Sequence, residues 1–157
     1  YMNHIDGAIA DGKHVQHVRV YYEDTDFSGV VYHASYLRFM ERGRTNYLRL
    51  IGADHRALFA QAAAEAPGFA FVVRRMTIDF QKPAYMDDVL AIVTTPKEIK
   101  GASITLNQKV MRGDVLLVEA DVQVAFVSGG RAKPIPLPLR IAMKADQDAS
   151  GAAGEMP

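Results

Sequence analysis

Hydrophobic and polar positions follow a helical period in the first half of the chain. From 34 to 51, apolar residues recur every three to four positions and share one face opposite a charged face, which is typical of an amphipathic helix. Gly52 would end this helix. An alanine-rich stretch from 54 to 66, closed by Pro67 and Gly68, predicts a second and shorter helix.

The other segments have the period of two that is typical of β-strands. Residues 74 to 81 alternate strictly between polar and apolar side chains, and 15 to 22 are mostly β-branched or aromatic. Further strands are predicted at 89–95, 103–111 and 115–127. The sequence Arg112-Gly113-Asp114 separates the last two, so it predicts a hairpin turn and not an adhesion motif.

The order of these elements predicts an α+β fold, with one antiparallel sheet of about five strands wrapped around one long central helix. A single helix covers one sheet face and leaves the outer strands with open edges, so a homodimer or homotetramer would complete the burial. We expect a flexible N-terminal segment at 1–14, the folded domain at 15–144 and a disordered tail of small and polar residues at 145–157.

Composition narrows the functional classes. The 157 residues, 49% of them hydrophobic, can bury the core of one domain without cross-links. No cysteine is present, which excludes disulfides, thiolate zinc clusters and a cysteine nucleophile, and an intracellular location is the default. Eighteen basic residues balance eighteen acidic ones, which argues against nucleic acid as a partner. No apolar run reaches the ~20 residues of a membrane span, and no secretory leader is expected.

Candidate chemistry is concentrated between the first predicted strand and the long helix. Glu23, Asp24 and Asp26 place three carboxylates within four positions, and a carboxylate can act as a base. Seven residues after Asp26, the helix begins near His33, where free backbone N–H groups can stabilise an oxyanion. From spacing alone, a solvated acidic turn explains these residues equally well.

The same run carries a family resemblance. Glu23-Asp24-Thr25-Asp26, followed by Gly29-Val30-Val31-Tyr32-His33-Ala34-Ser35-Tyr36, resembles the active-site signature of the 4-hydroxybenzoyl-CoA thioesterase superfamily, and especially its Tol-Pal-associated acyl-CoA thioesterase branch. The resemblance implies a hotdog fold and hydrolysis of an acyl-CoA thioester to a free acid and coenzyme A. It also implies that Asp26 is the nucleophile or the general base, that the His33 N–H polarises the carbonyl, and that the His33 and Tyr22 side chains assist.

The resemblance also bears on cofactors and partners. It implies that no metal or redox cofactor is needed, that acyl carrier protein could replace coenzyme A, and that the protein is cytoplasmic and could act peripherally at the inner membrane. Arg131 and Lys133 are candidates for contacts with coenzyme A phosphates at a subunit edge, although solvated loop charge explains them equally well. Phe27 and Ser28 fill the two positions that vary in the family signature, so the resemblance does not tell which acyl groups the enzyme prefers.

Parts of the same sequence are also compatible with other functions. A hotdog dehydratase acting on 3-hydroxyacyl thioesters would need a helical acid, for which Glu41 is the obvious candidate, and a non-catalytic acyl-thioester sensor or scaffold could use the same fold. Ser35 and His33 are two residues apart at a helix start, a spacing that does not bring them face to face as a nucleophile pair. Three histidines near the N-terminus lack carboxylate partners at a metal-binding spacing and are expected to be incidental surface residues: His4, His14 and His17.

Overall fold

A computed structural model describes residues 4–54 and 56–154. Its elements, in chain order, are η1 (His4–Asp6), β1 (Ala8–Ala10), β2 (Lys13–Arg19), η2 (Tyr22–Asp24), α1 (His33–Asp54), α2 (Arg56–Glu65), β3 (Ala70–Phe80), β4 (Val89–Ile99), β5 (Ser103–Arg112), β6 (Val115–Ser128), β7 (Arg131–Ala132) and α3 (Leu137–Gly154). Every strand and both helices predicted from the periodicity are present. The hairpin predicted at Arg112-Gly113-Asp114 joins β5 to β6.

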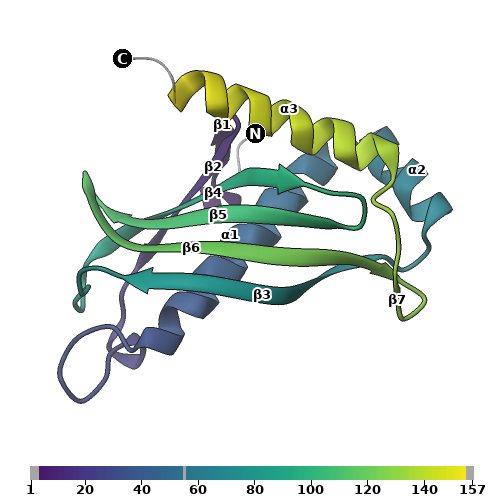
Figure 1. The fold of residues 1–157 in the computed structure, drawn as a ribbon. Helices are drawn as coiled ribbons and strands as arrows, with labels where there is room; N and C mark the ends of the chain where they lie inside the picture. The colour runs from purple at the N-terminus through teal and green to yellow at the C-terminus, as the bar shows by residue number, and fades with distance from the viewer. Residues whose placement is uncertain (1–3, 55, 155–157) are drawn as a thin grey trace.

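The strands form one antiparallel sheet, and α1 crosses one of its faces (Figure 1). Within the described residues the sheet has seven strands, in the order β1-β2-β4-β5-β6-β3, with β7 paired to β6. The predicted α+β arrangement of a sheet around one long helix is confirmed. The expected number of about five strands is too low, because β1 and β7 contain only three and two residues, too few to show an alternation.

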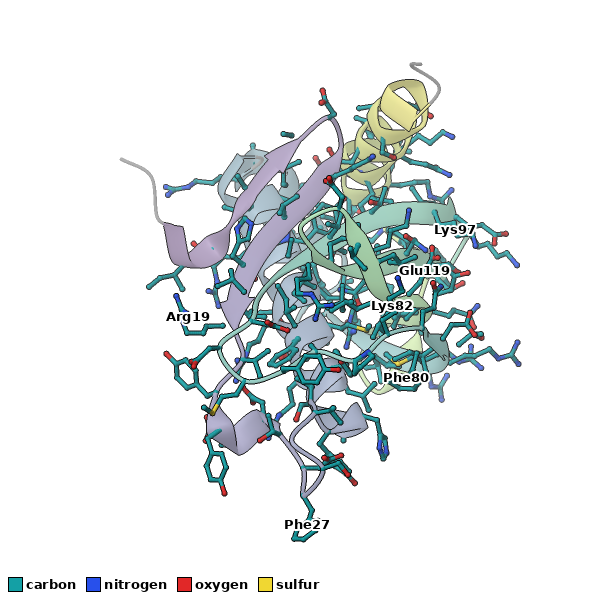
Figure 2. All side chains as sticks on the ribbon, turned by 90° about the vertical axis from the view of Figure 1, so that its left-hand side faces the viewer. Arg19, Phe27, Phe80, Lys82, Lys97 and Glu119 are labelled. Atoms are coloured by element: carbon teal, nitrogen blue, oxygen red, sulfur yellow. The ribbon has the colours of Figure 1, made fainter. Side chains whose placement is uncertain are left out.

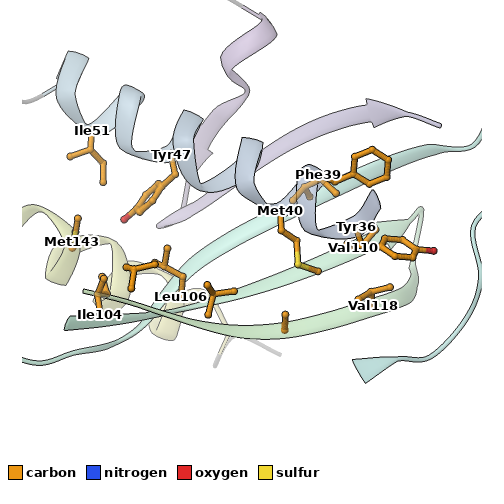
Figure 3. Packing of buried hydrophobic residues seen from close by; sticks show 14 of the residues in the cluster. Tyr36, Phe39, Met40, Tyr47, Ile51, Ile104, Leu106, Val110, Val118 and Met143 are labelled. Carbon is orange, nitrogen blue, oxygen red and sulfur yellow. The ribbon is translucent and has the colours of Figure 1, made fainter. Parts of the chain in front are cut away.

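The apolar face of α1 forms the centre of the core. Tyr36, Phe39, Met40, Tyr47 and Ile51 are buried, and Met40 and Tyr47 point toward the inward side chains of β5 and β6 (Figure 3). On the same helix face, a Cβ added at Gly43 would lie 3.0 Å from Ile92 Cγ2 and 3.1 Å from Thr94 Oγ1. The missing side chain therefore lets α1 approach β4 closely, at a helix-propensity cost of about 1 kcal/mol relative to alanine.

The N-terminal segment was predicted to be flexible, but the structure shows it folded from residue 4. Residues 4–14 form η1, β1 and the start of β2, and β1 pairs with β2. His14, expected at the surface, is fully buried, and its Nε2 lies 2.7 Å from the Asp6 carbonyl oxygen. The strand predicted from residue 15 therefore begins two residues earlier, at Lys13, and β1 adds a further short strand before it. Residues 1–3 lie outside the described residues.

The C-terminal segment is also corrected by the structure. Helix α3 continues to Gly154, although the small and polar residues from 145 onward predicted disorder. Leu139, Ala142 and Met143 are buried at helical spacing, and Tyr47 Oη donates a 2.7 Å hydrogen bond to Asp146 Oδ2. Helix α3 packs mainly on β4 and α2, and the Tyr47 hydrogen bond links it to α1, which composition alone does not reveal. Residues 155–157 lie outside the described part of the chain.

Candidate active site

Backbone hydrogen bonds within the loop from η2 to α1 hold its two sides together. Thr25 and Val31 form an antiparallel bridge, the Asp26 N–H donates to the Val30 carbonyl at 2.9 Å, and the Gly29 N–H donates to the Asp26 carbonyl at 3.0 Å. Gly29 has φ +82°, which glycine adopts without a steric penalty. Phe27 lies at the tip and points away from the body of the protein (Figure 2). The loop therefore holds Asp26 at a defined position beside the start of α1.

Asp24 anchors the base of this loop. Its carboxylate is buried, accepts a 2.9 Å hydrogen bond from the Tyr21 N–H, and lies 3.5 Å from Arg38 Nη2. Its carbonyl oxygen accepts hydrogen bonds from the Tyr32 N–H at 2.9 Å and from Ser35 Oγ at 3.1 Å. Ser35 is buried and bound to the loop, which supports a structural role for its hydroxyl and not that of a nucleophile.

Asp26 and His33 line the same open hollow, which has a volume of about 360 Å³. The Asp26 Oδ1 atom accepts a 2.8 Å hydrogen bond from the Ser28 N–H, and this carboxylate is exposed. The His33 ring lies 4.5 Å from the Tyr32 ring and 6.3 Å from the Phe80 ring, between centroids. The structure thus brings together two of the three predicted catalytic residues.

Helix α1 begins at His33, so the His33 N–H is among the first helix N–H groups, which have no acceptor inside the helix. The segment after β3 packs against this helix start, because the Val31 N–H donates to the Ala84 carbonyl at 2.9 Å and the Ala84 N–H donates to Tyr36 Oη at 3.2 Å. Burial raises the pKa of the Tyr36 hydroxyl, which therefore stays protonated and neutral at physiological pH. At Tyr36 the wall of the hollow is therefore neutral and partly apolar, whereas Lys82 of the segment after β3 adds a positive charge to the lining.

Tyr22, Arg131 and Lys133 do not line the hollow that contains Asp26. The Tyr22 side chain is 82% exposed and does not line the hollow. Arg131 pairs with Ser128, beyond the end of β6 that pairs with Ala70, whereas the hollow lies at the Phe80 end of β3. Ten strand residues, or roughly 33 Å, separate these two ends. Within one chain, Arg131 and Lys133 are therefore remote from Asp26.

Several lining residues could not be recognised in the sequence. Phe80, Gln81, Lys82 and Pro83 line the hollow from the end of β3 and the segment that follows. The only sequence signal was their position at the end of a strict alternation, and the fold is what brings them opposite Asp26. Across residues 4–54 and 56–154, no group of three acidic or histidine side chains could hold a metal ion. None of the helices in that part of the chain is long and apolar enough to cross a membrane.

The comparisons with known proteins agree with this geometry. A model of the thioesterase-like superfamily matches residues 20–145, which include the loop, α1 and the strands from β3 to β7. The chain belongs to the thioesterase-like superfamily.

The relatives of this thioesterase-like chain span most of its length. It is 45% identical over 124 residues to the acyl-CoA thioesterase YbgC of Haemophilus influenzae, covering 79% of this chain and 88% of that protein. It is 46% identical over 125 residues to the acyl-CoA thioester hydrolase YbgC of Escherichia coli, covering 79% and 89%. The solved structure of a probable thioesterase from Bartonella henselae is 38% identical, with a TM-score of 0.65, covering 79% and 98%. The expected hotdog fold is confirmed.

Proposed function

We propose that this protein hydrolyses an acyl-CoA thioester to a free acid and coenzyme A, with Asp26 as its catalytic carboxylate. The relatives named as acyl-CoA thioesterases, at 45% and 46% identity, support the reaction. The observation that carries the residue assignment is that Asp26 and the first residue of α1 line one open hollow. A carboxylate and a set of helix N–H donors are the two groups that acyl transfer from a thioester needs.

In this proposal the thioester carbonyl oxygen is directed at the His33 N–H. The partial positive charge at the start of α1 then stabilises the negative charge that develops on this oxygen when the carbonyl carbon is attacked. The His33 ring lies in the same hollow and can donate a further hydrogen bond. For Tyr22 the assisting role stays a prediction, because its side chain is 82% exposed and does not line the hollow.

Two routes are consistent with the position of Asp26. As a nucleophile, its carboxylate oxygen attacks the carbonyl carbon, the C–S bond breaks, coenzyme A leaves as the thiolate, and water then cleaves the mixed anhydride. As a general base, Asp26 takes a proton from water, the water oxygen attacks, and the departing thiolate receives a proton. Neither route requires a metal or redox cofactor. The exposed carboxylate, bound through Oδ1 by the Ser28 N–H, leaves both routes open.

A second copy of the chain would complete the site. Strand β3 is an edge of the sheet, with Val72, Val73 and Phe80 about half exposed along it. If two copies pair antiparallel through β3, the Ala70 end of one strand meets the Phe80 end of the other. Arg131 and Lys133 of the second copy would then approach Asp26 and could bind coenzyme A phosphates. We therefore propose a homodimer or a homotetramer, which the mass from light scattering would test.

The assignment is tested by thiol release from a panel of short, long and aromatic acyl-CoA esters. Asp26→Asn should lower kcat by about 10²–10⁴-fold, the usual contribution of a general acid–base group. Glu23→Gln is the matched control, because Glu23 is an exposed carboxylate of the same loop that does not line the hollow. Equal activity of wild type and Asp26→Asn would reject Asp26 as the catalytic carboxylate.

The same assay separates the remaining hypotheses. A sensor or scaffold would bind acyl-CoA without releasing thiol. The dehydratase hypothesis lacks support, because Glu41 does not line the hollow and its Oε1 accepts a hydrogen bond from Thr45 Oγ1 at 2.9 Å. Acyl carrier protein as a donor is tested by comparing acyl carrier protein and coenzyme A esters of one acyl chain. A cytoplasmic location, near the inner membrane or away from it, stays a prediction.

A further inference from the structure

A second and more enclosed cavity lies further along α1, between this helix, the sheet and α3. Its volume is about 190 Å³, and its walls are mainly apolar. The lining residues that matter here are Arg44 and Leu48 of α1, Phe71 and Val73 of β3, Ile104 of β5 and Met143 of α3. A cavity of about 150 Å³ can hold a benzene-sized apolar molecule, so this one has room for about six carbons.

One row of α1 residues leads from the candidate active site to this cavity. His33, Leu37, Glu41, Arg44 and Leu48 are spaced by three or four residues, so their side chains lie on one face of the helix. His33 lines the first hollow, and the last three line the cavity. The charge of Arg44 is held on the sheet side, because its Nη1 donates to Gln108 Oε1 at 3.0 Å.

A β-bulge in β3 extends this path along the sheet. Val73 pairs with Val124 and Arg75 pairs with Gln123, so Arg74 is an extra residue in the strand. The bulge places Phe71 and Val73 on the same face as Met76, Ile78 and Phe80, opposite buried side chains of β6. Strict alternation would have turned Phe71 and Val73 to the other face. We call the row on α1 and this face of β3 the α1–β3 seam.

Helix α3 closes the far end of the cavity. Met143 is 1% exposed and lies at the same end of the core as Ile104, Tyr47 and Ile51, away from Tyr36 (Figure 3). The next turn of α3 is fixed by two side-chain hydrogen bonds of 2.7 Å, from Tyr47 Oη to Asp146 Oδ2 and from Gln147 Nε2 to the Lys97 carbonyl. Asp146 and Gln147 lie beyond residue 145, where the match to the superfamily model ends.

We propose that the acyl chain of the substrate follows the α1–β3 seam from Asp26 to this cavity, and that Met143 sets the greatest chain length the enzyme accepts. This inference rests on the proposed function. Glu41, eight residues after His33, lies about 12 Å further along the helix axis. An extended chain advances about 1.3 Å per carbon, so about nine carbons reach the cavity and about six more fill it. The expected substrates are long unbranched acyl chains of about 12 to 16 carbons.

The test is thiol release from saturated acyl-CoA esters of four to eighteen carbons. In the wild type, KM should fall with chain length up to about 16 carbons, by about fourfold for each methylene that enters the cavity. Met143→Ala should move the preferred length up by two to four carbons, and Met143→Phe should move it down. Ile141→Ala, at an exposed position of the same helix, is the control that should leave the profile unchanged.

A second variant, on the cavity wall opposite α3, keeps the test informative if the Met143 variants fail to fold. Val73→Phe narrows the cavity from β3, where the side chain is 45% exposed in the single chain, so the chain should still fold, and the mass from light scattering checks that pairing through β3 is kept. It should raise KM at least tenfold for 16 carbons and leave kcat/KM for the four-carbon ester unchanged. The same profile in wild type, Met143→Ala and Val73→Phe would overturn the inference while leaving the proposed function intact. No thiol release from any ester in wild type would instead reject the proposed function.

Discussion

The two ends of α1 are built in different ways. At the His33 end, a surface loop and the segment after β3 surround an open hollow with an exposed carboxylate. At the Leu48 end, core side chains of the sheet and α3 enclose a smaller cavity with mainly apolar walls. Reacting groups can therefore change at the first end with little loss of folding free energy, whereas changes at the second end act on the core and on ligand fit together.

The largest stability effect is expected at the enclosed end. Met143→Ala removes a buried side chain and should lower the free energy of unfolding by about 2–5 kcal/mol. Turnover of a four-carbon ester should be unchanged at temperatures where the variant is folded. Urea unfolding monitored by circular dichroism measures the first effect. A free energy of unfolding within about 0.5 kcal/mol of the wild type, as is usual for surface substitutions, would show that α3 does not close the core.

The base of the loop should show an intermediate effect. Asp24→Asn removes the charge that binds the Tyr21 N–H and faces Arg38, at an expected cost of about 1–3 kcal/mol. Because Asp24 positions the loop that carries Asp26, kcat should also fall. Urea unfolding and thiol release measure the two changes, with Glu23→Gln as the control. If Asp24→Asn kept the free energy of unfolding and the kcat of the wild type, the position of the loop would not depend on this carboxylate.

A smaller and pH-dependent effect is expected at His14. Burial lowers the pKa of this imidazole below its usual 6.5, so the folded chain resists a proton that the unfolded chain accepts. Stability from this group is therefore full above pH 6.5 and decreases as the pH falls below that value, towards the lowered pKa. Urea midpoints between pH 7.5 and 5.5 should show a smaller decrease for His14→Phe than for wild type. The exposed His17→Gln serves as the control and should behave like wild type.

The smallest stability effect is expected at the tip of the active-site loop. Phe27 is fully exposed and points into solvent, so Phe27→Ser should change the free energy of unfolding by less than about 0.5 kcal/mol. A KM change for acyl-CoA without a kcat change would place Phe27 at the substrate entrance. A loss of stability above this limit would show that the ring packs against another subunit.

Sequence periodicity was sufficient where an element is long and has one buried face. The alternation from 74 to 81 and the helical period from 34 to 51 gave the main strands and α1, because burial of one face imposes those periods. Helix α3 was not predicted at all, because no helix was expected after β6 and its alanines, aspartates and glutamine beyond residue 144 resemble a tail until Asp146 is placed beside Tyr47. The bulge at Arg74 was also missed, because an extra residue appears only against the partner strand.

The sequence also predicted only the local part of the candidate site. Asp26 and His33 lie close in sequence and were predicted together, because the loop and the helix start that join them are local structure. Lys82 and Phe80 come from another element and enter the hollow only through the fold. Burial of Asp24 depends on Arg38 and on the loop closing over it, which the cluster of three carboxylates did not reveal.

The central claim is that Asp26 carries the chemistry at the open end of α1 without supporting the fold. The most direct test is to measure kcat for thiol release and the unfolding midpoint of Asp26→Asn in the same preparation. We predict a loss of about 10²–10⁴-fold in kcat with a free energy of unfolding within about 0.5 kcal/mol of wild type. Wild-type turnover in this folded variant would contradict the account.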